Sequence, residues 1–577
     1  MTEELKENSS RPLPNTMFEY KLDDGHRGQA VMLKECKQVQ PTSKWANWLN
    51  VKDIHDDKEC SINWNDILWW RPVTTESVMA TLLVDYLDDD ERIAVAKQNE
   101  MKNLQDHDVY ESVSDDGQEV ISCRWVITEK TKEDGTSIVK GRLVARGFED
   151  SSPGRTDSPT CSKQSLRLLF STASSMNWDV KSMDIKAAFL QGDELERDVY
   201  ALPPIDVREQ GKIWKLKRCI YGLCDAPRSW YKCVKNELVK KLNGTMSKYD
   251  KAFFLWHHQD GTLRGVIALH VDDFVYSGTS EWLSNVIGSI MKTFEISSSA
   301  QGCFRYLGLN LVQTREAIYV DQNDYIQELA GVQMSRERTK QTSETLEKSE
   351  IKKLRGLAGK LLWVGSNTRP DIAFDVCSVS NFGKSPKVSS IISANKTVEK
   401  VKKDNLKLIF PDLGNPDLWK VKVYSDASHA NLVSGASQGG YLVFAEGNGN
   451  LAPIVWCSKK LNRVTKSPLA SETMAFAEAA DAGNLVAEAI KELFGRTIHV
   501  DVVCYTDSKS LKDHLQTSNI IADKRLRVDM ARLQEMVELQ EIAVVWVDGK
   551  KQLADSLTKF GASAVQLMQV LGSGQHQ

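Results

Sequence analysis

Residues 268–278, ALHVDDFVYSG, place two adjacent aspartates, Asp272 and Asp273, inside an otherwise apolar run that favours β structure. An ionised carboxylate that is taken out of water is costly unless a partner compensates it. Two neighbouring carboxylates in one site therefore need a cation between them. The stretch predicts two strands joined by a tight bend, with the acid pair at the bend.

The chain around this stretch predicts β-hairpins. Residues 252–256 and 264–271 form one expected pair of strands around Asp260-Gly261, and the second strand runs directly into the acid pair. Residues 123–130 and 136–148 form another pair, around the Asp-Gly of residues 133–135. Asp-Gly between two β-prone runs is the strongest short hairpin signal. We therefore expect antiparallel sheets in this part of the chain.

Composition limits the class of protein. The chain has 577 residues, which is enough for about three or four domains. It is 41% hydrophobic and 26% charged, as globular proteins are. Its 11 cysteines contain no CxxC pair, so neither a zinc module nor a disulfide framework is indicated. The N-terminus lacks a signal-peptide pattern and no apolar run is long enough to span a membrane, so we expect neither secretion nor anchoring.

The net charge of −4 does not exclude nucleic acid, because local basic tracts decide that contact. Such tracts lie at residues 212–218, 352–360 and 458–466. Taken one at a time, each tract is better explained as the solvated face of a helix. Residues 352–403 as a whole could grip a nucleic-acid backbone or serve as a helical spacer, and both alternatives remain open.

Patterning along the chain predicts several segments. Residues 1–75 are polar and irregular and receive no element, residues 75–105 are helical and acidic, residues 335–349 are a linker, and residues 352–363 are a basic amphipathic helix. From residue 419 the order is three strands, an Ala-rich helix, a strand, a helix, a strand and a helix. That order predicts a separate mixed α/β domain with its own core.

The first acidic constellation pairs Asp272 and Asp273 with Asp184, which opens a strand-to-helix segment in KSMDIKAAFLQG. Three carboxylates from two segments fit two Mg²⁺ ions that serve an in-line phosphoryl transfer, one activating the attacking oxygen and one stabilising the leaving group. The plainer alternative makes Asp184 a helix N-cap and the acid pair a surface turn. For Asp184 alone we favour that alternative, and for the three acids together we favour the metal site.

The second constellation lies in the C-terminal α/β segment and comprises four acids: Asp426, Glu472, Asp507 and Asp555. Asp426 and Asp507 each end an apolar strand, and Glu472 lies in the Ala-rich helix. A parallel or mixed sheet would gather them at one edge. The alternative for Asp507, which Ser508 follows, is a helix N-cap.

Several motifs, in one order, resemble the polymerase of copia-type LTR retrotransposons. They are KGRLVARGF, SMDIKAAFLQGDELERDVY, LKRCIYGLCDAPRSWY, LHVDDF, YLGLNL and NTRPDIAFDV. The resemblance covers residues 122 to the C-terminus. It implies an α+β right-hand polymerase with fingers, palm and thumb/connection, followed by a mixed α/β RNase H-like domain.

The resemblance implies reverse transcriptase, a nucleotidyltransferase in which Asp184, Asp272 and Asp273 bind metal. Phe189 matches the bulky residue that clashes with a 2′-hydroxyl and selects deoxynucleotides, although without the family we would assign it to the core. Lys140 and Arg142 would hold the triphosphate, and which of them does so is left open. Two positions depart from the family: His270 replaces an aromatic residue, and Asp225 replaces a glutamine. Asp225 would repel triphosphate unless it points away or is neutralised.

The four C-terminal acids resemble those of RNase H, which the copia family carries after its polymerase. The resemblance implies a two-metal endonuclease that recognises an RNA–DNA hybrid by its shape and 2′-hydroxyls. An integrase shares this general fold but would need an Asp, Asp, Glu order and an upstream His/Cys zinc module. Neither is visible in the sequence.

The chain is therefore interpreted as the reverse transcriptase and RNase H region of a copia-type Pol polyprotein. We expect an unassigned segment at residues 1–75, fingers and palm at 76–333, a linker with thumb/connection at 334–418, and an RNase H-like domain at 419–577. The expected cofactor is Mg²⁺, two per site, with Mn²⁺ as an alternative. A catalytically silent nucleic-acid-binding remnant and a hybrid nuclease alone are the rival interpretations.

The same interpretation names partners and a location. The partners are an RNA template, a DNA primer strand, an RNA–DNA hybrid, dNTPs and particle proteins of the same element, with no membrane. The family implies a cytoplasmic virus-like particle and nuclear delivery of the product.

Overall fold

The computed structural model describes residues 89–131, 137–381, 383, 385–432, 434–495, 498–517, 521 and 523–576, and the backbone of five strands between residues 17 and 72. The chain divides into two compact units. The first unit takes residues 1–154 and 193–226, and the second takes residues 155–192 and 227–577. The chain therefore passes between the units three times.

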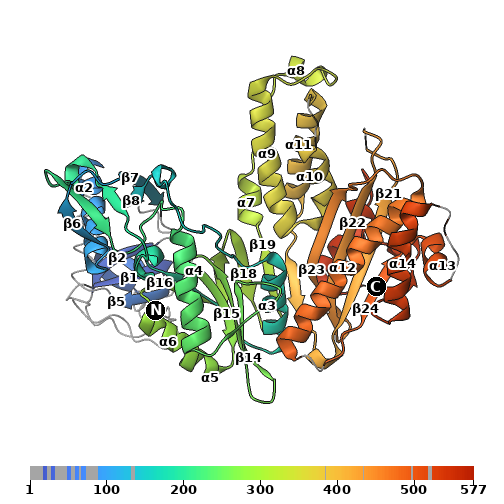
Figure 1. Ribbon diagram of the computed structural model, residues 1–577, viewed down its shortest axis with the longest axis horizontal. Coiled ribbons are helices and arrows are strands. Elements are labelled where there is room, and N and C mark those ends of the chain that lie inside the picture. The colour runs from blue at the N-terminus through green and yellow to red at the C-terminus, as the bar shows by residue number, and fades with distance from the viewer. Residues whose placement is uncertain are drawn as a thin grey trace. The chain divides into compact units, whose positions relative to one another are not determined.

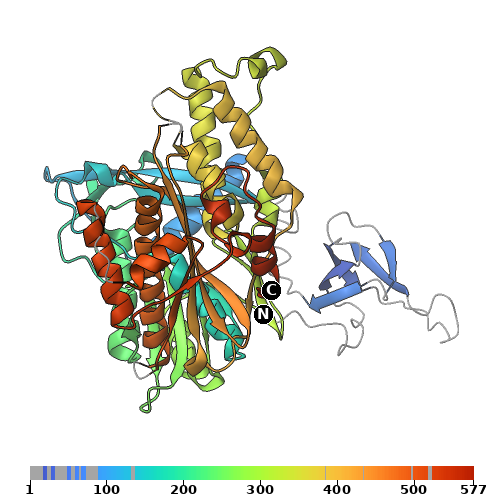
Figure 2. The same ribbon diagram turned by 90° about the vertical axis from the view of Figure 1, so that its right-hand side faces the viewer.

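The N-terminal segment contains a small antiparallel sheet, which is visible in Figure 2. Its strands are β1 (Met17–Leu22), β2 (Arg27–Met32), β3 (Trp48–Asp53), β4 (Glu59–Asn63) and β5 (Ile67–Pro72), in the order β4-β3-β2-β1-β5. Sequence patterning assigned no element to residues 1–75, and the structure corrects this. The strands are five or six residues long and stand within a segment whose overall polar composition masked them.

The first unit also holds a second five-stranded sheet. It comprises β6 (Tyr110–Ser114), β7 (Val120–Thr131), β8 (Ser137–Ala145), β10 (Tyr200–Leu202) and β11 (Lys212–Leu216), in the order β6-β11-β10-β7-β8, with α2 (Asp89–Asp106) packed on β8. Strands β7 and β8 are antiparallel, which confirms the predicted hairpin. Its Asp-Gly turn lies outside the described residues, as does the part of the predicted acidic helix that precedes Asp89.

A six-stranded sheet in the second unit carries the opening stretch of sequence. Its strands are β9 (Lys181–Ile185), β12 (Thr245–Met246), β13 (Phe253–His257), β14 (Leu263–His270), β15 (Asp273–Gly278) and β16 (Ile296–Gln301), in the order β12-β13-β14-β15-β9-β16. Strands β13 and β14 are antiparallel, so the second predicted hairpin is confirmed. Gly261 completes its turn with a φ of +88°, a conformation that favours glycine.

Helices cover this sheet on both faces, as Figure 1 shows. They are α3 (Lys163–Ser175), η4 (Ala188–Gln191), α4 (Ala226–Asn236), η6 (Glu237–Lys241), α5 (Ser280–Trp282), η7 (Leu283–Ile287) and α6 (Gly288–Thr293). The ring of Trp282 packs on Gly265 and Gly278, which face each other across β14 and β15. A side chain at either glycine would overlap the ring. This contact joins α5 to the sheet that bears the acid pair.

A helical bundle and a four-stranded sheet follow in the chain. The sheet is β17 (Cys303–Tyr306), β18 (Leu309–Gln313), β19 (Ala317–Asp321) and β20 (Leu408–Pro411), and the helices are α7 (Asn323–Glu328), α8 (Arg336–Lys340), α9 (Lys348–Asn367), α10 (Ala373–Ser380) and α11 (Val388–Lys403). Helices α9, α10 and α11 stand together in Figure 1 and bury one apolar cluster between them. Helix α9 confirms the predicted basic helix.

The expected linker at residues 335–349 is more ordered than its composition suggested. Ser335 caps α8 by accepting a hydrogen bond from the backbone N–H of Arg338. The guanidinium of Arg338 in turn donates two hydrogen bonds to Glu350, at 3.0 and 2.8 Å. These side-chain contacts replace the apolar periodicity that sequence patterning requires, so the pattern alone missed the helix.

The C-terminal segment has the predicted mixed α/β elements, but its apolar core is continuous with that of α3 and one face of the six-stranded sheet, so it has no separate core among the described residues. Its sheet has the order β23-β22-β21-β24-β25, formed by β21 (Lys420–Ser428), β22 (Gln438–Gly447), β23 (Asn450–Lys460), β24 (Val502–Thr506) and β25 (Ala543–Trp546). The helices are α12 (Pro468–Phe494), α13 (Lys509–Leu515), α14 (Lys524–Glu538) and α15 (Val565–Ser573). Strands β21, β24 and β25 are parallel, whereas β21, β22 and β23 are antiparallel.

Helix α12 lies close against this sheet at Gly483. A Cβ atom there would be 2.6 Å from Cγ2 of Val423 and 3.0 Å from Cγ1 of Val502. Only glycine therefore permits the observed helix–sheet distance, and this distance sets how near the start of α12 comes to the ends of β21 and β24.

A helix crosses a membrane only if it is long and apolar. In the described part of the chain, none of the helices combines the length and the apolar composition that a membrane span needs.

Candidate active sites

The first acidic group lies where β9 and β15 run side by side. Asp184 of β9 pairs directly with Asp273, the first residue of β15. Asp272 lies in the bend between β14 and β15, and its carbonyl accepts a hydrogen bond of 3.0 Å from the N–H of Ile185. The backbone thus brings the three predicted acids to one end of one sheet. Asp184 lies inside a strand, so the helix N-cap alternative is wrong.

The bend itself is under backbone constraint. Val271 has a φ of +58°, in the left-handed region that a β-branched residue disfavours. Its carbonyl accepts a 2.7 Å hydrogen bond from Nε1 of the buried Trp230. Trp230 therefore holds the bend in a conformation that the local sequence disfavours.

Burial and charge make this end of the sheet electronegative. Burial, together with the nearby carboxylates of Asp272 and Asp184, raises the pKa of Asp273 to about 6. Ser297 donates a hydrogen bond to Asp184 from a bulge in β16, between Ile296 and Ser298. Sequence reasoning missed Ser297, because its position depends on a bulge in a strand that pairs with β9 from far along the chain.

The oxygen atoms of this group are less converged than those of the second group. Within the described part of the chain, one set of three or more His, Cys, Asp or Glu side chains has ligand atoms that all lie within 4.8 Å of one another, and that set is Asp426, Glu472 and Asp507. The pairing of β9 with β15 makes the acids neighbours. It does not by itself bring their oxygens to metal-binding distance.

Two other predicted residues lie beside the first group. Phe189 lies in η4, which follows Ala187 at a φ of +46°, and its half-buried ring packs on the apolar core of the six-stranded sheet. His270 pairs with Asp273 across β14 and β15. Burial lowers the pKa of His270, against the opposing effect of Asp272. Burial therefore favours the uncharged imidazole of His270.

The remaining predicted residues of the polymerase site lie in the first compact unit. Lys140 is exposed on β8, and the guanidinium carbon of Arg142, on the same face of that strand, lies 5.4 Å from the centre of the Tyr221 ring. Asp225 is paired with Arg197 at 3.0 Å, and the same guanidinium reaches Asp150 at 2.6 Å. Asp225 thus shares one guanidinium with Asp150 within its own unit, so its charge is offset only in part.

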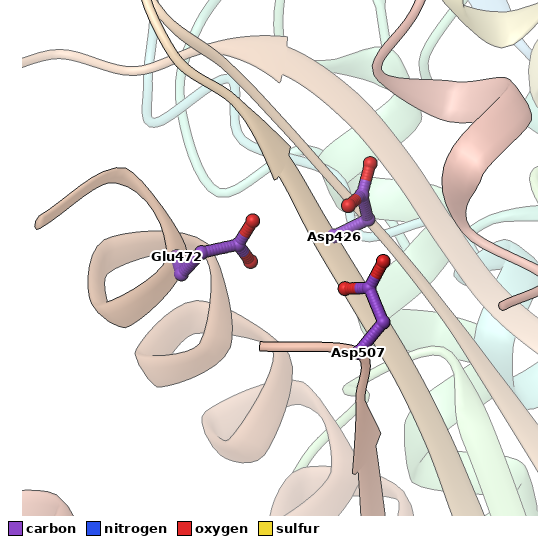
Figure 3. A group of neighbouring side chains, drawn as sticks. All are labelled: Asp426, Glu472 and Asp507. Atoms are coloured by element: carbon purple, nitrogen blue, oxygen red, sulfur yellow. The ribbon is translucent and has the colours of Figure 1, made fainter. Parts of the chain in front are cut away.

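The second acidic group converges on the edge of the C-terminal sheet. Asp426 lies in β21 and Asp507 directly follows β24, and these two strands are parallel neighbours. Glu472 projects from the second turn of α12, and the three carboxylates point toward one another in Figure 3. Ser508 caps α13 by accepting a hydrogen bond from the N–H of Leu511. The N-cap alternative for Asp507 is therefore wrong.

The electrostatics of this group call for a cation. Burial raises the pKa of Glu472 to about 9, and the charges of Asp426 and Asp507 act in the same direction. Burial also raises the pKa of Asp426 to about 6, against the opposing charge of Lys559. Oε2 of Glu472 is buried without a hydrogen-bond partner. An all-carboxylate set of this kind suits Mg²⁺ or Mn²⁺, because hard divalent cations prefer oxygen ligands.

The carboxylate of the fourth acid, Asp555, forms an ion pair with a lysine that sequence reasoning missed. Asp555 opens η11 (Asp555–Leu557), and its carboxylate binds Nζ of Lys559, which also lies 3.5 Å from Asp426. Thr558 donates a hydrogen bond to Asp426. Residues four apart lie on one side of a helical turn, and this spacing was the signal available in LADSLTK.

Part of the chain matches a known protein family. Residues 107–343 match the family model "Reverse transcriptase (RNA-dependent DNA polymerase)". This part of the chain is therefore similar to reverse transcriptases. The predicted polymerase class is confirmed as a reverse transcriptase fold, and the segment contains Asp184, Asp272 and Asp273.

Relatives of the reverse transcriptase extend the match beyond this segment. The chain is 28% identical over 463 residues to the retrovirus-related Pol polyprotein from transposon RE1 of Arabidopsis thaliana, covering 76% of this chain and 31% of that protein. It is 28% identical over 499 residues to the one from transposon TNT 1-94 of Nicotiana tabacum, covering 80% of this chain and 36% of that protein. The resemblance to copia-type Pol polyproteins is confirmed. The chain spans about a third of the length of these relatives.

Among solved structures, the chain is similar to a foamy viral protease-reverse transcriptase in complex with an RNA/DNA hybrid. The two are 12% identical, with a TM-score of 0.42, and the match covers 96% of this chain and 73% of that one.

Proposed function

We propose that the chain copies an RNA template into DNA at Asp184, Asp272 and Asp273. We further propose that it cleaves the RNA of the resulting hybrid at Asp426, Glu472, Asp507 and Asp555. The observation that carries the proposal is that two separate acid groups, on two different sheets, lie in one compact unit. Each group has a carboxyl whose pKa is raised by burial and by the neighbouring carboxylates.

In the polymerase step, Asp184, Asp272 and Asp273 would hold the divalent ions, whose charge activates the attacking oxygen and offsets the charge on the leaving group. The protein's own part is to keep the three carboxylates at one sheet end. Trp230 contributes by donating a hydrogen bond to the bend at Val271. Ser297 contributes by donating a hydrogen bond to Asp184.

Selection of the nucleotide is assigned to residues outside the acid group. Phe189 would exclude a 2′-hydroxyl from the sugar site. Lys140 and Arg142 would contact the triphosphate of a dNTP, as cations facing a polyanion. Because Arg197 pairs with Asp225, the repulsion between that acid and the triphosphate would be reduced.

In the nuclease step, the acids of the C-terminal domain would hold ions that prepare a water molecule and stabilise the scissile phosphate. Glu472 offers an oxygen without a hydrogen-bond partner, and Asp426 is nearly fully buried. Little side-chain movement is then needed around the first ion. We assign this domain to the RNase H-like class, and the substrate to RNA paired with DNA.

The helical bundle is proposed as the grip on the duplex. Helix α9 exposes five basic side chains and an aromatic one: Lys348, Lys352, Lys353, Arg355, Lys360 and Trp363. Its other face is buried in the bundle. Cations on one exposed helix face bind a nucleic-acid backbone with strong salt dependence.

We extend the proposal to the domains, the partners and the location of the chain. Residues 76–333 would form fingers and palm, 334–418 the thumb/connection and 419–577 the RNase H-like domain. RNA template, DNA primer, hybrid, dNTPs and particle proteins of the element would be its partners. A cytoplasmic virus-like particle, with nuclear delivery of the product, would be its setting.

A hybrid nuclease without polymerase activity is the second candidate. It is favoured by the closer convergence of Asp426, Glu472 and Asp507, compared with the acids of the first group. The two candidates differ in a single assay, because only a polymerase extends a primer.

The test follows Mg²⁺-dependent extension of a DNA primer and cleavage of its RNA template in one tube. We expect D272N/D273N to abolish extension and retain RNA cleavage, and D507N to do the reverse. Cleavage without extension in the parent protein would leave the nuclease alone. A parent protein that binds the hybrid but neither extends nor cuts it would be a silent remnant.

A further inference from the structure

Lys559 is a cation built into the second acid group. Its Nζ binds the carboxylate of Asp555 and lies 3.5 Å from Oδ2 of Asp426. Only four residues separate Lys559 from Asp555, so one short segment supplies both an acid and its counter-ion. The Lys559 side chain is 41% exposed, which leaves it room to withdraw toward solvent.

The four acids form two distinct positions. The oxygens of Asp426, Glu472 and Asp507 lie within 4.8 Å of one another, and Figure 3 shows their carboxylates directed at a common point. Asp555 does not belong to that set, and Lys559 bridges it to Asp426. The ammonium therefore lies between the two acids that share the second position.

We infer that this group has one ready metal position, at Asp426, Glu472 and Asp507, and that the ammonium of Lys559 occupies the second. A second divalent ion binds between Asp426 and Asp555 only after it displaces Lys559. The inference rests on the proposed function, because it takes the group to bind Mg²⁺ or Mn²⁺.

The physical reason is competition between cations for the same two carboxylates. An ammonium at hydrogen-bond distance neutralises part of their charge, so a divalent ion gains less on binding. Lys559 thereby lowers the affinity of the second position below what its two carboxylates alone would give. It also limits repulsion among four carboxylates when metal is scarce.

The test is a calorimetric titration of the full chain with Mn²⁺, in a D272N/D273N background so that the first acid group contributes little. We expect one tight ion and one weaker ion in this parent. Replacing the cation by a neutral side chain, K559M or K559Q, should tighten the weaker ion by at least about tenfold, the equivalent of ~1.4 kcal/mol. K559R retains the charge and should leave the second affinity low.

A loss of packing could only weaken metal binding, so tightening separates competition from a structural role. An unchanged second affinity in both K559M and K559Q, with tight binding abolished by D507N, would overturn the role of Lys559 and leave the proposed metal centre standing. Two equally tight ions in the parent would overturn it as well. If neither the parent nor the neutral variants bind Mn²⁺, the proposed metal centre and the inference both fail.

Discussion

The guanidinium carbon of Arg167 lies 3.6 Å from the centre of the Trp456 ring, which connects helix α3 to strand β23 of the C-terminal sheet. The same guanidinium donates hydrogen bonds to the carbonyls of Ile454 at 2.9 Å, Ser366 at 2.8 Å and Asn367 at 3.1 Å. The indole N–H of Trp456 donates to the carbonyl of Gly365 at 2.8 Å. Helix α3, the end of α9 and strand β23 thus meet at one buried cation.

Replacing Arg167 by methionine should lower the free energy of unfolding by about 3 kcal/mol, because buried carbonyls would lose charge-assisted donors. R167K should also destabilise, since an ammonium lacks the planar fork that reaches three carbonyls and stacks on an indole. Urea unfolding followed by tryptophan fluorescence measures the effect. R315M, at an exposed arginine, is the control. Equal stability of R167M and R315M would contradict the role given to Arg167.

Gly483 should not tolerate a side chain. In G483A the new methyl would press on Val423 and Val502, and we expect a loss of about 1–3 kcal/mol of stability. The matched control is G356A, in the exposed face of α9, where a Cβ meets nothing within 4 Å. There the same substitution should stabilise by about 0.5–1 kcal/mol. In thermal denaturation, G483A should lower the melting temperature and G356A should raise it. A melting temperature that is unchanged in G483A would contradict the close packing of α12.

Ser297 should act as a positioning residue for Asp184. S297A removes the hydroxyl that donates to that carboxylate. A lost hydrogen bond of about 1 kcal/mol predicts roughly fivefold slower primer extension, with an unchanged KM for dNTP. S297T keeps the hydroxyl and should restore the rate. RNA cleavage by the same preparation is the internal control, and a parallel fall in cleavage would point to misfolding instead.

The buried Glu100 should make stability depend on pH. Burial raises its pKa above 4.5, although its carboxylate accepts a hydrogen bond from the N–H of Leu143. The folded state then binds more protons than the unfolded state, so stability falls as pH rises from 4.5 toward the folded-state pKa. E100Q should remove this slope and be the more stable protein at neutral pH. Melting temperatures of the parent protein and of E100Q, measured at several pH values in this range, would reveal the slope. The exposed variant E196Q is the control.

The exposed face of α9 should dominate the salt dependence of duplex binding. The variant K352A/K353A/R355A/K360A should bind an RNA–DNA hybrid more weakly. It should also reduce the slope of log K against log salt by about 0.9 for each phosphate contact that is lost. A control that removes four exposed lysines elsewhere, K212A/K232A/K240A/K292A, should change the slope less. Similar slopes in the two variants would refute the assignment of α9 as the grip.

Local sequence signals predicted much of the fold, because they act over a few residues. The Asp260-Gly261 turn predicted β13 and β14, and the run before Asp272 predicted the strand and the bend. Strand ends at Asp426 and Asp507 placed both acids at one sheet edge. The polar composition of residues 1–75 masked the strands β1 to β5. Helix α8 was missed because side-chain hydrogen bonds hold it and it lacks an apolar periodicity.

The sequence by itself determined which acids form two groups, and which family its reverse transcriptase segment resembles. Only the tertiary structure decided how tightly each group converges and what holds it. The bulge that brings Ser297 to Asp184, the insertion of Lys559 beside Asp426, and the stacking of Arg167 on Trp456 join residues more than 100 positions apart. Periodicity and turn chemistry act over short spans, whereas these contacts depend on how completed sheets and helices pack.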